Sequence, residues 1–207
     1  MPAYDRDHWE RLWNKAVQEH ANVLAHRPPN AHFLSAVAGL PASRALDAGC
    51  GHGAETLWLA AHGWNVTAVD FSDTALAHAR SAAEVLGPEV SGRVEWVQGD
   101  LGNWTPESNR YDLVICLYVH VAGSVAELVH RLAAGVAPGG TLLLVGHRPI
   151  DPATGAPTPA AGQEQVSVDE ALAALVPDRW NVVVAEDRPR RDPGSGVDAV
   201  IHVIRKG

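Results

Sequence analysis

The chain has 207 residues, of which 46% are hydrophobic and 19% charged, and its formal net charge at pH 7 is −8. This length predicts one domain with a full hydrophobic core, and the composition excludes a disordered or fibrous chain. The negative balance argues against a nucleic-acid partner, because binding to a phosphate backbone rests on clustered Lys and Arg. The one tight basic cluster, Arg188-Pro189-Arg190-Arg191, is short and is expected to be a solvated turn.

The cysteine content and the lack of long apolar runs indicate the compartment. Two cysteines, Cys50 and Cys116, are too few for a disulfide scaffold. The first residues lack the basic-then-apolar order of a signal peptide, and no apolar run approaches the ~20 residues that a membrane helix needs. We therefore expect a cytoplasmic protein without a membrane partner, either a monomer or a homodimer.

Strand-like and helical patterns alternate along the chain, which is typical of an α/β fold with a parallel sheet. An amphipathic helix at 9–24 and a second helical piece at 31–38 come first. A short strand then begins at Ala45, and further elements follow: helices at 54–61, 72–86 and 125–134, and strands at 65–70, 93–98, 111–117 and 141–145. A Pro-rich segment, 149–159, precedes two strand-like runs, 180–186 and 197–205, which are expected to form a hairpin on the sheet edge.

The most informative stretch is the glycine-rich segment 45–56, ALDAGCGHGAET. Its glycines permit a tight strand-to-helix turn and let a ligand approach bare backbone, next to the free N–H groups of a helix N-terminus. Asp70 ends the next strand 21 positions after Gly49 (70 − 49), where a carboxylate can accept hydrogen bonds from both hydroxyls of a ribose. On these residues alone, Gly49-x-Gly51-x-x-Ala54 also fits a dinucleotide site, and Asp70 also fits a simple turn cap.

Three further features sharpen this interpretation. Asp47 lies two residues before the first glycine, where a carboxylate disfavours a pyrophosphate and favours a cationic ligand. Gly99-Asp100-Leu101 closes the third strand, where Asp100 can accept a hydrogen bond from an adenine amino group. Pro138-Gly139-Gly140 forms a predicted turn before the apolar fifth strand.

In this order, and together with Tyr111-Asp112-Leu113-Val114, the motifs resemble those of the class I S-adenosylmethionine-dependent methyltransferases over about residues 44–147. The resemblance implies an α/β, Rossmann-like sheet of seven strands, mostly parallel with the last strand antiparallel. Helices would cover both faces, and a helical N-terminal lid would precede the sheet. A single domain, 1–207, would then comprise a helical cap (1–43), a cofactor-binding core (44–147), and a long loop, helix and C-terminal hairpin (148–207).

The resemblance also implies S-adenosylmethionine as cofactor and S-adenosylhomocysteine as product. The glycine turn would pass beneath the methionine part, with Asp47 near its ammonium group, and Asp70 would hold the ribose. Phe71 would lie against the adenine, although it also fits a plain core position. The full set of implied cofactor residues is Asp47, Gly49, Cys50, Gly51, Gly53, Asp70, Phe71, Asp100, Leu101, Cys116 and Leu117.

Residues for the acceptor are expected at the carboxyl ends of the fourth and fifth strands, because ligands of open α/β sheets bind there. His120 and His147 are candidates for a base or an acceptor-orienting group, since imidazole exchanges protons near neutral pH. Both histidines also fit structural roles. Further candidates are Tyr118 for catalysis, Arg148 for an acidic acceptor, and a lid made of Tyr4, His8, Trp9 and Trp13. A surface position for Arg148 and simple packing for the tryptophans remain open.

The class of acceptor is inferred from motifs that are missing. There is no His-Glu-x-x-His or Cys-x-x-Cys spacing, and Cys116-Leu117-Tyr118 stands where metal-dependent catechol-type relatives carry acidic ligands, so no metal is expected. There is also no Asn/Asp-Pro-Pro-Tyr/Phe motif of the enzymes that methylate nucleic-acid bases or protein glutamine. A small-molecule acceptor with a thiol, chalcogen or nitrogen nucleophile is favoured.

The short chain with its Trp-containing N-terminal helix looks like the tellurite-resistance and thiopurine methyltransferase type. Two alternatives stay open, an NAD(P)-binding oxidoreductase and a non-catalytic S-adenosylmethionine-binding protein.

Overall fold

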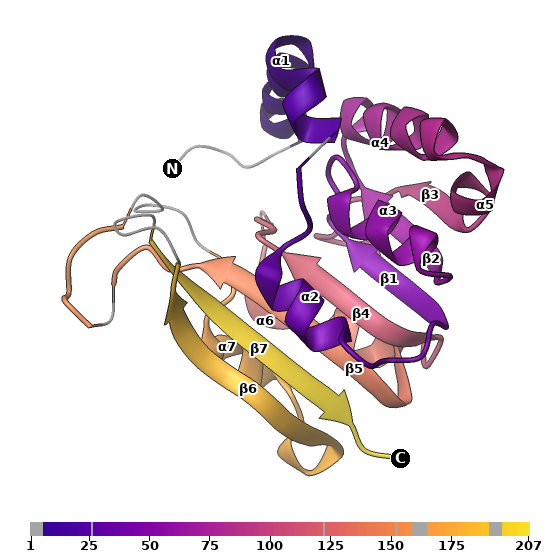
Figure 1. The fold of residues 1–207 in the computed structure, drawn as a ribbon. Helices are drawn as coiled ribbons and strands as arrows, with labels where there is room; N and C mark the ends of the chain where they lie inside the picture. The colour runs from indigo at the N-terminus through magenta and orange to yellow at the C-terminus, as the bar shows by residue number, and fades with distance from the viewer. Residues whose placement is uncertain (1–5, 26, 122, 152, 159–164, 191–195) are drawn as a thin grey trace.

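The computed structural model describes residues 6–25, 27–121, 123–151, 153–158, 165–190 and 196–207. Seven strands form one sheet in the order β3-β2-β1-β4-β5-β7-β6 (Figure 1). The strands are β1 Arg44–Ala48, β2 Asn65–Asp70, β3 Val94–Gln98, β4 Tyr111–Leu117, β5 Val136–His147, β6 Trp180–Pro189 and β7 Val197–Arg205.

The direction of the strands confirms the predicted topology. Strands β1 to β5 pair in parallel, whereas β7 is antiparallel to both β5 and β6. The carboxyl ends of β1 to β5 therefore lie along one edge of the sheet, and the beginning of β7 lies at that same edge. This reversal brings a late segment of the chain to the edge where ligands of such sheets bind.

Helices cover both faces of the sheet, as predicted. They are α1 Arg6–Ala25, α2 Ala31–Val37, α3 Ala54–Ala61, α4 Asp73–Leu86, α5 Pro88–Ser91, α6 Val125–Gly135 and α7 Val168–Ala174, with a 3₁₀ turn at Pro177–Arg179. Polar caps begin several of them: Ser72 accepts a hydrogen bond from the Ala75 N–H at the start of α4, and Asn30 accepts one from the His32 N–H at the start of α2.

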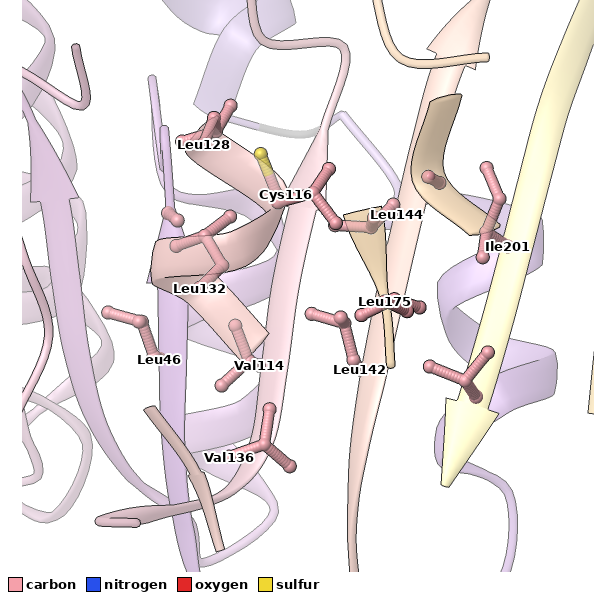
Figure 2. Close-up of a cluster of buried hydrophobic side chains, with 14 of the residues drawn as sticks. Leu46, Val114, Cys116, Leu128, Leu132, Val136, Leu142, Leu144, Leu175 and Ile201 are labelled. Atoms are coloured by element: carbon pink, nitrogen blue, oxygen red, sulfur yellow. The ribbon is translucent and has the colours of Figure 1, made fainter. Parts of the chain in front are cut away.

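The hydrophobic core has two layers because neighbouring residues of a strand point to opposite faces. On one face, Leu46 of β1 and Val114 of β4 pack with Leu132 of α6, and Leu175, directly after α7, joins this cluster (Figure 2). On the other face, strand residues one position along pack against Phe33 of α2 and Leu59 of α3. These strand residues include Ala45 of β1, Leu113 and Ile115 of β4, and Leu143 of β5. Both layers are buried, so the central strands hold the site edge rigidly.

The start of β5 differs from the prediction. The expected turn Pro138-Gly139-Gly140 lies inside β5, because Val136 already pairs with Tyr111 before the register shifts. Gly139 has φ of +79°, which suits a glycine at such an irregularity. The local Pro-Gly-Gly signal was thus correct about an irregular backbone and wrong about a strand boundary.

The N-terminal helix α1 packs on α4 at the edge of the sheet (Figure 1). Glu10 of α1 accepts a hydrogen bond of 3.2 Å from the Thr74 N–H at the first turn of α4. In the described part of the chain, no helix combines the length and the apolar character needed to cross a membrane.

Candidate active site

The carboxyl ends of the parallel strands and helix α1 enclose a cavity of about 880 Å³. A volume of this size suits a cofactor-sized ligand together with a small molecule. The structure brings most of the predicted residues together in its wall: Trp9, Trp13, Asp47, Gly49, Cys50, Gly51, Asp70, Phe71, Asp100, Leu101, Leu117, Tyr118, His120 and His147.

The glycine turn is shaped so that larger residues do not fit. Gly49 and Gly51 have φ of +84° and +50°, values that favour glycine. A Cβ atom at Gly49 would collide with Val119 Cγ2, and one at Gly51 would lie 2.8 Å from Trp13 Cζ2. The N–H of Gly49 donates a 2.8 Å hydrogen bond to the Val69 carbonyl, which fixes the turn against β2. The turn therefore offers bare backbone to the cavity.

Asp70 at the end of β2 is bonded to the glycine turn. Its Oδ2 accepts a hydrogen bond of 2.9 Å from the Gly51 N–H, and its Oδ1 accepts one of 2.9 Å from the Ser72 N–H. Burial raises the pKa of the Asp70 carboxyl, while these backbone donors oppose that change. Each oxygen has a second lone pair, so the carboxylate can still accept hydrogen bonds from a ligand.

Asp47 at the end of β1 is a deeply buried acid of the cavity. Its side chain is 3% exposed, and the Thr56 hydroxyl donates a 2.6 Å hydrogen bond to its Oδ2. Burial, reinforced by the nearby charge of Glu55, raises its pKa to about 8. A cationic ligand beside Asp47 would favour the ionised carboxylate.

Asp100, Leu101 and Phe71 line the cavity beyond β2 and β3. Asp100 is exposed, and its Oδ1 accepts a 2.8 Å hydrogen bond from the Gly102 N–H. Leu101 is buried, whereas Phe71 is partly exposed. This end of the cavity thus combines two apolar surfaces with an accessible carboxylate.

Tyr118 after β4 adopts a backbone conformation that is uncommon for a residue with a side chain, with φ of +58°. Its hydroxyl accepts a 2.8 Å hydrogen bond from Asn30 Nδ2 and donates a 2.9 Å bond to Asp198 Oδ2. Burial and the charge of Asp198 raise the pKa of the Tyr118 phenol. Tyr118 therefore remains protonated and acts as a donor.

His120 and His147 both line the cavity, as predicted, but their surroundings differ. His120 Nε2 lies 2.7 Å from the Gln165 amide nitrogen, and its ring centroid is 5.2 Å from that of Trp9. His147 Nδ1 lies 3.0 Å from Asp198 Oδ1, and its ring centroid is 4.1 Å from that of Tyr118. His147 is thus paired directly with a carboxylate.

Several predicted residues do not reach the cavity. Cys116 packs in the core next to α6, where burial raises its pKa to about 12, and Gly53 packs against Ala79 of α4. His8 contacts Trp9 but is not part of the cavity wall, and Arg148 pairs with Asp187 at 3.3 Å. Tyr4 lies outside the described residues.

Some residues of the wall were missed by the sequence reasoning. Arg188 and Arg190 belong to the basic cluster expected to be a solvated turn, yet both line the cavity because β6 extends to Pro189. Asp198 is the one acid of a mostly apolar strand, and this was the signal that could have revealed it. Other polar residues of the wall that were missed are Arg27, Asn30, His32, Ser35, His52 and Glu55.

The described His, Cys, Asp and Glu side chains give no support to a metal centre. Among the described residues, no group of three His, Cys, Asp or Glu side chains is arranged to hold a metal ion.

The sequence is similar to known methyltransferases. Residues 45–140 match a family model described as a methyltransferase domain. The ubiquinone biosynthesis O-methyltransferase of Xanthomonas campestris pv. campestris (strain B100) is 33% identical over 167 residues, covering 80% of this chain and 65% of that protein. The glycine N-methyltransferase of Rattus norvegicus is 30% identical over 175 residues, covering 75% and 59%. The chain therefore spans less than two thirds of the length of these relatives.

A solved structure extends the likeness to nearly the whole chain. The N-methyltransferase NodS from Bradyrhizobium japonicum WM9, in complex with S-adenosylhomocysteine, has a TM-score of 0.71 at 15% identity, covering 96% of this chain and 98% of that chain. With the sheet order above, this likeness shows that the protein has the Rossmann-like methyltransferase fold.

Proposed function

We propose that this protein transfers a methyl group from S-adenosylmethionine to a small-molecule acceptor. The observation that carries the proposal is the buried pair of carboxylates, Asp47 and Asp70, on either side of a glycine turn that opens into a cavity of about 880 Å³. The match of residues 45–140 to the methyltransferase-domain family and the methyltransferase names of the relatives support it.

The residues present fit this cofactor. The glycine turn provides a surface without side chains, and Asp47 provides the negative charge that an ammonium group requires. Asp70 would accept hydrogen bonds from the ribose, while Phe71, Asp100 and Leu101 would contact the adenine. When bound, the cofactor supplies a sulfonium whose methyl carbon is open to attack by a nucleophile.

The opposite part of the cavity would hold the acceptor. Its wall carries His120, His147 and Tyr118, with Trp9 against the ring of His120. Neutral imidazoles suit an acceptor that must lose a proton, such as an amine or a thiol. A thiol, chalcogen or nitrogen nucleophile therefore remains our preferred acceptor. We also propose that the enzyme is of the tellurite-resistance or thiopurine methyltransferase type. Of the relatives named above, one is named as an O-methyltransferase and the other as an N-methyltransferase.

The proposal also covers the oligomeric state, the cellular compartment and the partners of the protein. We infer that the whole chain works as one domain in the cytoplasm, as a monomer or homodimer, without a nucleic-acid partner; the net charge of −8 supports the last point. Of the two alternatives, neither the oxidoreductase nor the non-catalytic binding protein gains support from the comparisons. When ionised, Asp47 beside the glycine turn would repel a pyrophosphate and attract an ammonium group.

A mass-spectrometric screen tests the activity. The protein is incubated with cofactor that carries a trideuteromethyl group and with pools of small thiols, amines and phenols. The proposal predicts a product that gains the labelled methyl group with the wild-type protein and not with the Asp70→Ala variant. Binding of the cofactor without any labelled product in a broad panel would instead favour the non-catalytic alternative.

A further inference from the structure

Asp198 is the second residue of β7, and the strand direction explains why it reaches the cavity. Because β7 runs antiparallel to β5, its first residues lie beside the last residues of β5, and Asp198 pairs in register with His147. The Asp198 side chain is 2% exposed and forms part of the cavity wall. The reversed strand thus places a buried carboxylate next to a candidate base.

Four side chains surround the Asp198 carboxylate. The Tyr118 hydroxyl lies 2.9 Å from Oδ2, His147 Nδ1 lies 3.0 Å from Oδ1, and Arg190 Nη2 lies 2.9 Å from Oδ1. His32 Nε2 is 3.7 Å from Oδ2. Burial by itself raises the pKa of Asp198, but hydrogen bonds from these side chains hold it well below its usual range. Asp198 therefore carries a negative charge.

We propose that Asp198 is a positioning residue that holds His147 as the neutral tautomer with its proton on Nδ1, leaving the Nε2 lone pair to accept a proton from the acceptor. This inference rests on the function proposed above. A lone pair on Nδ1 would face a carboxylate oxygen at 3.0 Å and be repelled, whereas an N–H there forms a charge-assisted hydrogen bond.

Arg190 lies beside the same edge of the ring as Asp198: its Nη2 contacts His147 Nδ1 and donates a 2.9 Å hydrogen bond to Asp198 Oδ1. Its Nη2 lies 3.0 Å from His147 Nε2, a distance at which an N–H donor meets a lone pair. An acceptor that reaches His147 would replace this contact.

The other groups near His147 are compatible with a neutral ring. Tyr118, which follows β4, stays protonated because its pKa is raised, and His32 of α2 faces the far oxygen of Asp198. The His147 backbone N–H donates to Gln165 Oε1, which fixes the main chain at the end of β5. Asp198 therefore orients the imidazole ring of His147, whereas Gln165 fixes the main chain of this residue.

The proposed step balances in atoms and charge. The proton of the acceptor passes to His147 Nε2, and the electron pair of the acceptor forms a bond to the methyl carbon. The bond between that carbon and the sulfonium sulfur breaks, and its electron pair stays on sulfur. The imidazolium that results lies 3.0 Å from the negative charge of Asp198, which stabilises it.

Nitrogen-15 NMR of the full-length protein at neutral pH tests the tautomer directly, with His147 assigned by the His147→Gln variant. We expect a protonated Nδ1 and an unprotonated Nε2 in the wild type, and loss of this preference in Asp198→Asn. The matched control is Asp187→Asn, which removes an acid of β6 that pairs with Arg148 outside the cavity wall and should leave the tautomer unchanged. An Nε2–H tautomer, a doubly protonated ring, or an unchanged ring in Asp198→Asn would overturn the proposal.

Kinetics with the acceptor found in the isotope screen provide the second readout. Asp198→Asn should lower kcat by about 10²-fold with little change in the KM for the cofactor, since it disturbs a proton transfer and not cofactor binding. The acid limb of the pH–kcat profile should move to lower pH, because the imidazolium loses a stabilising charge. A normal rate and profile would contradict the proposal. If S-adenosylhomocysteine does not bind while the NMR result holds, the proposed function fails and the positioning geometry stands.

Discussion

Thr56 and Asp47 are joined by a hydrogen bond of 2.6 Å at the floor of the cavity, between the first turn of α3 and the end of β1. The hydroxyl is the one side-chain donor to Asp47 among the described contacts, and it compensates only part of the cost of burying the carboxylate. Burial, together with the charge of Glu55, therefore raises the pKa of Asp47 to about 8. In the free protein at neutral pH, Asp47 holds a proton.

This proton makes the stability of the protein depend on pH. The folded state binds the Asp47 proton more tightly than the unfolded chain, in which the pKa of this carboxyl is near 3.8. The stabilisation is fully present below pH 3.8 and is lost as pH rises through about 8. Asp47→Asn imitates the protonated form, so it should unfold at a higher temperature than the wild type at pH 8 and at a similar temperature at pH 4.5.

Thermal unfolding at both pH values measures this effect, with Asp112→Asn as control. Hydrogen bonds from Ser43 and Arg44 outweigh the effect of burial and lower the pKa of Asp112, so this variant should lose stability at pH 8. An equal difference between Asp47→Asn and the wild type at both pH values would show that Asp47 is not the titrating group.

Cofactor binding should release the same proton. An ammonium group beside Asp47 favours the ionised carboxylate, so a proton must leave as the ligand enters. Calorimetric titration of S-adenosylhomocysteine at pH 7, in buffers with different ionisation enthalpies, should therefore give apparent enthalpies that follow the buffer. The Asp47→Asn variant should lose this dependence. An enthalpy that is independent of the buffer in the wild type would place the ammonium group elsewhere.

Two glycines allow backbone strain to be separated from collision with a neighbour. Gly39 and Gly49 have nearly equal φ values, +82° and +84°. A Cβ atom at Gly39 meets nothing within 4 Å, whereas one at Gly49 meets Val119. Gly39→Ala should therefore cost about 1 kcal/mol in unfolding free energy and leave ligand binding intact.

Gly49→Ala should cost several times more, because it adds a collision at the cavity wall to the same backbone strain, and it should abolish binding of S-adenosylhomocysteine. Urea unfolding and calorimetry of the two variants provide the comparison. Equal losses in both would mean that the glycine turn is constrained by its φ values alone.

The parts of the site that could be predicted are those set by short segments. The glycine turn, Asp47 and Asp70 lie within 24 residues (47–70) of strand, turn and strand end, so spacing alone aligns them along the sheet edge. Tyr118 and His147 were predicted by the same reasoning, since Tyr118 follows β4 and His147 ends β5.

The missed residues depend on distant pairing. Asp198 reaches the cavity only because β7 runs against β5, and Arg190 reaches it only because β6 pairs with β7 up to Pro189. Cys116 was misplaced for a simpler reason: it follows the alternation of β4 into the core, whereas Leu117, the next residue, lies in the cavity wall. Register and direction, which the sequence pattern specifies only weakly, decide these positions.

Asp70→Ala should weaken binding of S-adenosylhomocysteine by about 1–3 kcal/mol, which corresponds to roughly 5- to 150-fold in Kd. The loss has two sources: the hydrogen bonds from the ribose, and the orphaned N–H groups of Gly51 and Ser72. Asp70→Asn keeps one oxygen acceptor, so its Kd for S-adenosylhomocysteine should lie between those of Asp70→Ala and the wild type. An unchanged Kd in Asp70→Ala would mean that Asp70 only caps its turn.

The most direct test of the central claim is a calorimetric titration of the wild-type protein with S-adenosylhomocysteine and, separately, with NADH. A cavity with Asp47 and Asp70 beside bare glycine backbone should bind the first ligand with a Kd in the micromolar range and should not bind the second. Binding of NADH, or no heat of binding with S-adenosylhomocysteine well above micromolar concentration, would contradict the account.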